Sequence, residues 1–427
     1  MYYFHVTLAS LANLMIVSSI TQLETAVEWR YIDYTWPSEA AKENAILSGE
    51  YNYTQVIPMD IEIARDGRMF VSMLSFPGTP ATMGIVTDRV EYPGPLVKPY
   101  PSWDWFKKGD CENSIVEAFR FVIDRCNRLW IMDTGREESA TIRCPAKLWA
   151  FDLNTDKLLK KVILPFKISR NVRTKRSLMT SVEVEVYGNH CENTTVYMSD
   201  GFGNALIVWD GTRLTRFEGM PFQPIRNFTN IAVTSASVNL GLGLTGIRVS
   251  PIFWPGETRY LYFRPASSLD LYAVDVAELK NVPLNHTVKV HSTKNVISSQ
   301  AITMTFSPQG TLFVTPSKES TIVCWNRYRK LEKENVEIVA QDDRLLVVSG
   351  LKIVKNPTTK ENELLLISNH YPKFITNRLN FNEFNYFVLK KNLKEFVKGT
   401  KCEVPQKILN NPRAVYDFHD DPFSYRQ

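Results

Sequence analysis

Acidic side chains at predicted strand ends are the first residues in this sequence that could do chemistry. Asp124, Asp133 and Asp200 each lie beside a hydrophobic strand segment. Carboxylates in such positions could bind a cation or accept a proton. The alternative interpretation is that each aspartate caps the turn at the end of its strand. Asp133, Asp200 and His370 are the candidate catalytic residues, and no spacing in the sequence shows that any two of them meet.

Standard catalytic and metal-binding motifs are absent from the sequence. It contains no Gly-x-Ser-x-Gly, phosphate loop, His-Glu-x-x-His or Cys-x-x-Cys. The six histidines are scattered, and no two have the i, i+4 spacing that places two metal ligands on one helix face. His190 is interpreted as a loop residue beside a disulfide at Cys191 rather than as a zinc ligand. We therefore expect no metal and no cofactor.

Six short hydrophobic segments of similar pattern recur along the chain. Each follows a turn, and most end in a polar residue. Their central residues, 51 to 67 positions apart, are Phe70, Trp130, Tyr197, Tyr262, Phe313 and Leu365. Such recurrence is typical of propeller blades, which usually repeat at about 40–50 residues. The sequence therefore predicts an all-β, six-bladed β-propeller over residues 27–405, with loops inserted in the blades.

Composition agrees with a globular β-sheet protein. Of the 427 residues, 44% are hydrophobic and 12% are aromatic, which suits sheets built from large flat side chains. The net charge of +5 is small for this length, and no nucleic-acid recognition motif accompanies it. We expect no nucleic-acid partner and no membrane span, and the oligomeric state stays open.

The N-terminus resembles a secretory signal. Residues 6–20 form an apolar stretch too short to span a bilayer, and small residues follow it. We predict a signal peptide over residues 1–21, cleaved between 19 and 26, and hence a secreted, extracellular protein. Residues 411–427 are predicted to form a flexible C-terminal tail.

Two further features fit export. Six cysteines allow disulfides, whose pairing the residues alone leave open. Sequons predict glycosylation, with chance occurrence as the alternative, at Asn52, Asn193, Asn227 and Asn285.

A basic segment stands out at residues 170–176. It carries four positive charges in seven residues. Such a segment could bind an anionic surface or a glycan. The alternative is a solvated loop without a partner.

Several motifs, in order along residues 30–405, resemble the yellow / major royal jelly protein family of insects. They include Pro101-Ser-Trp-Asp-Trp105 before Cys111, Asp124-Arg-Cys-Asn-Arg-Leu-Trp-Ile-Met-Asp-Thr-Gly135 before Cys144, Tyr197-Met-Ser-Asp200, Tyr260-Leu-Tyr-Phe-Arg-Pro265, Cys324-Trp-Asn326 and Ile367-Ser-Asn369. The resemblance implies a secreted six-bladed propeller, in agreement with the six recurring segments.

The resemblance also implies two disulfides. These are Cys111–Cys144 and Cys191–Cys324. Two cysteines remain. Cys126 lies in a hydrophobic segment, so we expect a buried free thiol there, and the pairing of Cys402 stays open.

A ligand site is implied near residue 369. Some salivary members of the family bind biogenic amines in the channel, and Asn369 and Tyr371 match two of their binding residues. The matching hydroxyl position is Gly350, which has no side chain, although Ser349 is adjacent. An amide carbonyl and an aromatic ring would suit a small aromatic amine. The alternative is that Asn369 caps its strand and Tyr371 packs under a loop.

Gln300 also belongs to a segment that resembles a family motif. Its side chain could line the channel, or it could tie blades together through its amide.

Three functions follow from these observations. The first is a secreted propeller that binds a small aromatic or amine-type ligand in the channel, with a role in pigmentation. The second is an enzyme similar to the dopachrome-converting members of the family, which would need a proton donor and acceptor such as Asp133, Asp200, His370 or Tyr371. The third is a structural or nutritive protein without a defined ligand. One fold hosts many functions, so the resemblance does not decide among them.

Overall fold

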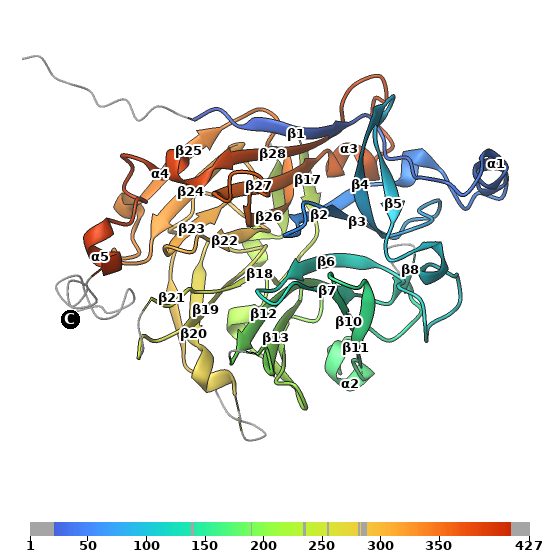
Figure 1. Cartoon of the computed structure of the whole chain (residues 1–427). Coiled ribbons are helices and arrows are strands. Elements are labelled where there is room, and N and C mark those ends of the chain that lie inside the picture. The colour runs from blue at the N-terminus through green and yellow to red at the C-terminus, as the bar shows by residue number, and fades with distance from the viewer. Residues whose placement is uncertain are drawn as a thin grey trace, which may run out of the picture.

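The computed structural model of this chain is a ring of six four-stranded antiparallel sheets (Figure 1). It confirms the predicted six-bladed β-propeller. The structure describes residues 21–410 except 138–140, 189, 234–235, 254–255, 281 and 283–287. Nearly all of the predicted signal peptide and the whole predicted tail lie outside these residues. In the described part of the chain, no helix is long and apolar enough to cross a membrane.

The blades follow one another along the chain, and each runs from an innermost strand at the channel to an outermost strand. Blade 1 contains β2 (Pro58–Ile63), β3 (Met69–Met73), β4 (Met83–Glu91) and β5 (Gly94–Pro99). Blade 2 contains β6 (Ala118–Ile123), β7 (Arg128–Asp133), β10 (Lys147–Asp152) and β11 (Lys157–Ile163). Blade 3 contains β12 (Met179–Tyr187), β13 (Asn193–Asp200), β14 (Ala205–Trp209) and β15 (Leu214–Glu218). Blade 4 contains β18 (Leu244–Val249), β19 (Tyr260–Pro265), β20 (Leu271–Asp275) and β21 (Val290–Thr293). Blade 5 contains β22 (Met304–Phe306), β23 (Thr311–Val314), β24 (Thr321–Asn326) and β25 (Val336–Gln341). Blade 6 contains β26 (Val347–Lys355), β27 (Asn362–Asn369), β28 (Tyr386–Asn392) and the N-terminal strand β1 (Glu24–Trp29).

Short elements fill the connections between these strands. Two hairpins stand apart from the blades, β8 (Arg136–Glu137) with β9 (Thr141–Ile142) and β16 (Asn230–Val233) with β17 (Ala236–Asn239). The helices are α1 (Glu39–Leu47), α2 (Phe166–Ser169), α3 (Tyr371–Ile375), α4 (Leu393–Val397) and α5 (Gln406–Asn410).

The six recurring sequence segments are the second strands of the six blades, β3, β7, β13, β19, β23 and β27. In β7, Leu129 and Ile131 pack in the cluster shared with blade 1, whereas Trp130 and Met132 pack in the cluster shared with blade 3. Because side chains alternate across a strand, a strand between two neighbouring blades buries both faces. Burial on both faces explains why the segments are hydrophobic at consecutive positions.

The N-terminal strand closes the ring. β1 pairs antiparallel with β28, so blade 6 holds the first and the last strands of the described chain. Trp29 is fully buried, and its indole N–H donates to the carbonyl of Pro95 in blade 1 at 2.7 Å. A Cβ at Gly94 would lie 2.6 Å from the Trp29 ring, so only glycine leaves room for this contact. β1 begins within the predicted cleavage window, and Leu23 before it is also buried.

A β-bulge interrupts five of the six innermost strands at the corresponding position. The pairing of each innermost strand with its second strand shifts by one residue there. The bulged residues are Met59, Phe119, Thr180, Thr245 and Ser349. A bulge interrupts the regular alternation of its strand, so these five side chains do not follow the in-and-out order of their neighbours.

Beyond the bulges, charged side chains cross the channel. Arg120 of blade 2 donates to Ser181 of blade 3 and to the carbonyl of Ile302, just before blade 5. Arg248 of blade 4 donates to the carbonyl of Leu351 in blade 6. Because these contacts join non-adjacent blades, the guanidinium groups occupy the middle of the ring.

Carboxylates lie beside the cations of the channel, which also include Lys352 of blade 6. Lys352 lies 3.1 Å from Asp60 and 3.3 Å from Glu62, and Arg248 lies 3.4 Å from Glu183. Burial raises the pKa of Glu62 to about 7, although Lys352 opposes the shift. Lys352 and Arg248 are thus paired with carboxylates, as buried charges require, whereas Arg120 donates to a hydroxyl and a carbonyl.

The disulfides correct part of the sequence analysis. Cys111–Cys144 is present, as the resemblance implied. Cys191 pairs with Cys126 rather than with Cys324, and Cys324 pairs with Cys402. The predicted free thiol at Cys126 is therefore wrong. The Cα atoms of Cys126 and Cys191 lie 6.4 Å apart across blades 2 and 3, within the reach of a disulfide.

Peptide mapping without reduction tests this pairing. We expect three cystine-linked peptide pairs, Cys111–Cys144, Cys126–Cys191 and Cys324–Cys402, and no thiol that reacts with a labelling reagent under denaturing conditions. A linked pair containing Cys191 and Cys324 would contradict the structure.

Ring closure is tested by Trp29→Ala. The substitution removes a buried indole and its hydrogen bond to Pro95, so we expect the free energy of unfolding to fall by about 4 kcal/mol. Chemical denaturation measures the change. Leu47→Ala, at a position that is 85% exposed, is the control. Equal effects of the two substitutions would show that β1 does not hold the ring closed.

Candidate functional site

A cavity of about 200 Å³ lies at the end of the channel where the innermost strands begin. Three bulged residues form part of its wall, Met59, Phe119 and Ser349. The other lining residues are Leu74, Phe76, Glu117, Leu178, Phe202, Ile231, Val238, Leu240, Leu242, Ile302, Val347, Asn369, Tyr371 and Pro372. The wall is mainly apolar, and its few polar side chains come from blades 2 and 6. This composition is typical of small-molecule sites.

Asn369 is held by three hydrogen bonds. Its Nδ2 donates to the carbonyl of Pro58 at 2.9 Å and to Ser349 Oγ at 3.0 Å. Its Oδ1 accepts from the backbone N–H of Tyr371 at 3.1 Å, at the start of α3. Asn369 therefore both caps the strand end and lines the cavity. Its Oδ1 has a second lone pair that a ligand could use.

Ser349, the neighbour of Gly350, lines the cavity wall. A Cβ at Gly350 would lie 2.4 Å from Asp60 Oδ1, so a side chain there would collide with the charged cluster of the channel. The bulge at Ser349 turns its side chain to Asn369 instead. Because Ser349 Oγ accepts from Asn369, its own O–H remains a donor for a further group.

Glu117 is a cavity residue that the sequence analysis did not identify. It is buried in the wall, where Oε1 accepts from the N–H of Ser75 at 3.1 Å and Oε2 accepts from Thr134 Oγ1. Burial raises its pKa to about 7, and Asp133 adds to the rise, while these hydrogen bonds and Arg136 lower it. The carboxyl group can therefore change its charge near neutral pH. It precedes its strand without any motif, so only the three-dimensional arrangement identifies it.

Tyr371 lies close to this carboxyl group. Burial and the charge of Glu117 both raise the pKa of Tyr371. The phenol is therefore neutral at physiological pH, and its ring forms part of the cavity wall.

Two arginines flank another part of the wall. The guanidinium of Arg176 lies 4.6 Å from the centre of the Phe202 ring, and that of Arg136 lies 5.9 Å from it. The cavity therefore has cations on the Phe202 side and hydrogen-bond acceptors at Asn369 and Glu117.

The three aspartates stabilise turns and strand ends. Asp124 pairs with Arg128 at 2.7 Å and accepts from the indole of Trp130. Asp200 accepts from two backbone N–H groups and pairs with Arg216 at 3.0 Å. These contacts agree with the capping interpretation of both residues.

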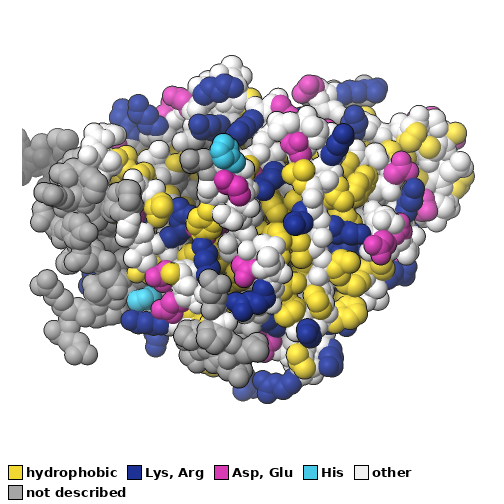
Figure 2. All heavy atoms as spheres, turned by 60° about the horizontal axis from the view of Figure 1, so that its bottom comes forward, with side chains coloured by type: hydrophobic (Ala, Val, Ile, Leu, Met, Phe, Trp, Pro, Cys, Tyr) yellow, Lys and Arg dark blue, Asp and Glu magenta, His cyan; other side chains and the backbone are white. Residues whose placement is uncertain are grey.

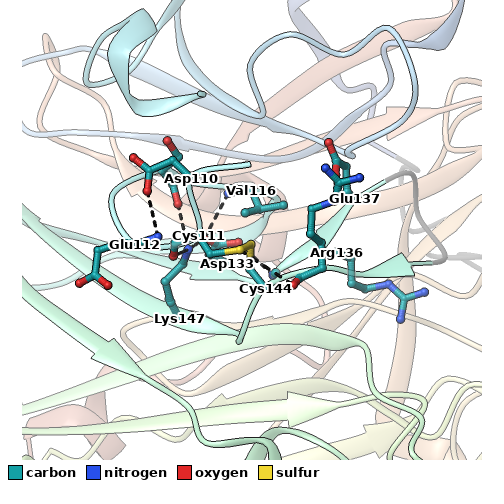
Figure 3. Close-up of a disulfide and its surroundings, with 12 residues drawn as sticks. Asp110, Cys111, Glu112, Val116, Asp133, Arg136, Glu137, Cys144 and Lys147 are labelled. Carbon is teal, nitrogen blue, oxygen red and sulfur yellow. Dashed lines mark hydrogen bonds and ion pairs between the residues drawn. A yellow bond between two sulfur atoms is a disulfide. The ribbon is translucent and has the colours of Figure 1, made fainter. Parts of the chain in front are cut away.

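Asp133 is buried beside the Cys111–Cys144 disulfide (Figure 3). It accepts from the backbone N–H groups of Val116, Glu117 and Gly135 and lies 3.3 Å from Lys147 Nζ. Its contact with the N–H of Glu117 fixes the backbone of that cavity residue. Asp133 therefore positions the cavity wall without being part of it.

His370 and Gln300 also lie beside the cavity wall rather than among its lining residues. Burial lowers the pKa of His370 to about 4, so its imidazole is neutral at physiological pH. Gln300 donates to the carbonyls of Phe228 and Asn230 and so ties down the β16–β17 hairpin. This contact holds a hairpin that stands apart from the blades, so it matches neither of the two roles expected for Gln300, lining the channel or tying blades together.

The predicted glycosylation sites remain predictions. Asn52, Asn193 and Asn227 are exposed, so a glycan could be attached to each without disturbing the core. Asn285 lies outside the described residues. His190 is also exposed, next to the Cys126–Cys191 disulfide.

The fold and the cavity together define a propeller with a small apolar chamber at one end of its channel. The family model of the major royal jelly proteins matches residues 116–402, and the chain belongs to this family.

Curated relatives agree with this assignment. Major royal jelly protein 2 of Apis mellifera is 33% identical over 387 residues, which cover 88% of this chain and 84% of that protein. Major royal jelly protein 6 of the same species is 31% identical over 396 residues and covers 90% of this chain and 89% of that protein. Among solved structures, virginiamycin B lyase from Staphylococcus aureus covers 80% of this chain with 10% identity and a TM-score of 0.41, which is too distant to bear on function.

The charge of Glu117 can be tested through stability. Its pKa is raised in the folded state, so its ionisation above about pH 7 destabilises the fold. This destabilisation is absent at low pH, where the carboxyl group is protonated. We expect Glu117→Gln to be more stable than the wild type by up to about 3 kcal/mol near pH 8, with little difference near pH 4. Urea denaturation across this range measures the difference. The exposed Glu43→Gln is the control, and a pH-independent difference would show that Glu117 does not titrate as inferred.

Proposed function

We propose that this protein binds a small aromatic ligand carrying an amine in the cavity at the channel end. One observation carries the proposal: Asn369, Ser349 and Glu117 present polar groups to a wall that is otherwise apolar and aromatic. An aromatic ring would be buried against Phe119, Phe202 or Tyr371. Burial of apolar surface would supply most of the affinity.

The polar groups would orient the amine. The Oδ1 of Asn369 has a free lone pair, and Glu117 can ionise to balance an ammonium group. A cation over the face of Tyr371 would add roughly 0.5–2 kcal/mol. The arginines beside Phe202 would keep the ammonium group on the Asn369 side.

We further propose that the protein acts outside the cell, with a role in pigmentation. Three disulfides and exposed sequons support secretion, because both are typical of exported proteins. The pigmentation role rests on the resemblance to yellow-type proteins alone.

A second function is favoured by Glu117. A carboxyl group with a pKa of about 7 beside a tyrosine could move a proton on a bound indole precursor, as a dopachrome-converting enzyme requires. Asp133, Asp200 and His370 would not be needed for this step. Glu117 would be the acid and base in their place.

Calorimetric titration with dopamine, serotonin and octopamine tests the binding function. We expect saturable binding that Asn369→Ala weakens at least about tenfold, because the substitution removes the acceptor and releases Ser349 and α3. Asn382→Ala, at an exposed asparagine, should bind as the wild type does. Dopachrome decay, followed by absorbance in parallel, would favour the enzyme if Glu117→Gln abolished it. Absence of both signals would contradict the proposed site and favour a structural or nutritive protein.

The pH dependence of the binding affinity distinguishes a cationic amine from an uncharged ligand. Protonation of Glu117 removes its charge, so amine affinity should fall by up to about tenfold per unit as the pH drops below about 7. Arg136, which also faces Glu117, is a guanidinium that does not titrate in this range and contributes no such change. Calorimetry with Glu117→Gln should show a flat profile, and the same slope in that variant would rule out Glu117 as the titrating group.

A further inference from the structure

Residues 157–176 form the most unevenly charged segment of the chain. They contain eight lysines and arginines and no aspartate or glutamate, whereas the whole chain carries a net charge of +5. The rest of the chain therefore has a net charge of −3. The basic segment at 170–176 is only one end of this longer stretch.

The structure places this segment on the outside of the ring. It comprises β11, the outermost strand of blade 2, then α2, and then the loop 170–176. Figure 1 shows α2 directly below β11, and Figure 2 shows basic and hydrophobic side chains interspersed on the side of the molecule turned forward there. We call residues 157–176 the basic face.

The basic face also exposes large apolar side chains. These are Leu158 at 40% exposure, Leu159 at 53%, Ile163 at 46%, Phe166 at 48% and Val172 at 60%. An outermost strand with lysines alone would be explained by protection of a free sheet edge against aggregation. Exposed leucine, isoleucine and phenylalanine have the opposite effect, so edge protection does not explain this face.

Part of the charge is held in place, and part is free to contact a partner. Lys161 pairs with Glu112 at 3.0 Å, and the guanidinium of Arg170 lies 3.7 Å from the centre of the Phe166 ring. In contrast, Lys157, Lys167, Arg173 and Lys175 are exposed, and none of them forms an ion pair within the described part of the chain.

The loop has an ordered backbone. Asn171 Oδ1 accepts from the N–H groups of Arg173 and Thr174, and its backbone N–H donates to the carbonyl of Arg176. The apolar Val172 and the basic Arg173 are therefore presented together at the tip of a closed loop. Both kinds of side chain are available to a partner without further folding.

We propose that the basic face docks on a membrane surface that contains anionic phospholipids. Cations next to exposed leucine, phenylalanine and valine match the boundary between lipid headgroups and acyl chains, where anionic headgroups attract the cations and the apolar side chains insert. A sulfated glycan or a nucleic acid would use the cations but would leave the apolar side chains exposed. Peripheral docking of this kind needs no membrane-spanning segment, and it does not depend on the proposed ligand of the cavity.

Vesicle sedimentation with the full-length protein tests the proposal. We expect binding to vesicles of phosphatidylcholine with phosphatidylglycerol and none to phosphatidylcholine alone. One variant reverses the free charges by changing Lys157, Lys167, Arg173 and Lys175 to Glu. Since each of the four cations near an anionic surface contributes about fivefold, this variant should bind at least about 600-fold more weakly. A second variant changes Leu159, Phe166 and Val172 to Ser and should also lose binding, because it keeps the charge but lacks the inserting side chains.

Two controls keep the test decisive. Lys394→Glu with Lys398→Glu reverses two exposed charges far along the chain, on and after α4, and should bind as the wild type does. Heparin binding and the thermal unfolding midpoint of the serine variant show whether it is folded with its basic face intact. The proposal would be overturned if the serine variant bound vesicles as strongly as the wild type and if heparin displaced it from them. That result would show that the basic face binds polyanions rather than a lipid surface. Equal binding to both kinds of vesicle, or to neither, would overturn it outright.

Discussion

Closure of the ring is the constraint on which the rest of this molecule depends. A blade buries both of its faces only when it has a neighbour on each side, and blade 6 acquires its outermost strand from the N-terminal end of the described chain. The cluster between blades 6 and 1 contains Trp29, Tyr386 and Val388 from the two strands that close the ring. The cavity depends on the same closure, because Asn369 of blade 6 donates to Pro58 of blade 1.

Within the closed ring, the bulges mark the boundary between the apolar cavity and the charged part of the channel. Before and at the bulges, Met59, Phe119 and Ser349 contribute to an apolar chamber. Past the bulges, charged side chains occupy the channel, where Lys352 and Arg248 pair with carboxylates. Gly350 stands at the boundary, since its missing side chain makes room for Asp60 while its neighbour Ser349 points to the chamber. A ligand in the cavity would therefore contact apolar side chains in the wall and would have the charged part of the channel beneath it.

The blades could be predicted from the sequence because their second strands are buried on both faces, which leaves a strong hydrophobic signal in each repeat. The candidate site was predicted only in part. Asn369 and Tyr371 belong to a motif, but Glu117 comes from another blade and lies in no recognisable pattern. The pairing of Cys126 with Cys191 depends on how closely two blades approach, and the bond of Gln300 to the region of the β16–β17 hairpin joins segments about 70 residues apart in the sequence. Sequence reveals what recurs within a blade, whereas contacts between blades need the assembled ring.

The guanidinium groups that cross the channel have a mechanical consequence. Arg120 connects blade 2 to the segment before the opposite blade 5, and Arg248 connects blade 4 to blade 6, so both hydrogen bonds join non-adjacent parts of the ring. Widening the channel to admit a larger ligand would break these hydrogen bonds. Adaptation to a different guest would have to come from the loops at the rim, above all from the β16–β17 hairpin and α3, while the blades keep their spacing. The blade strands that supply Asn369 and Ser349 thus serve both the architecture and the cavity, whereas the hairpin and α3 contribute to the cavity from outside the blades.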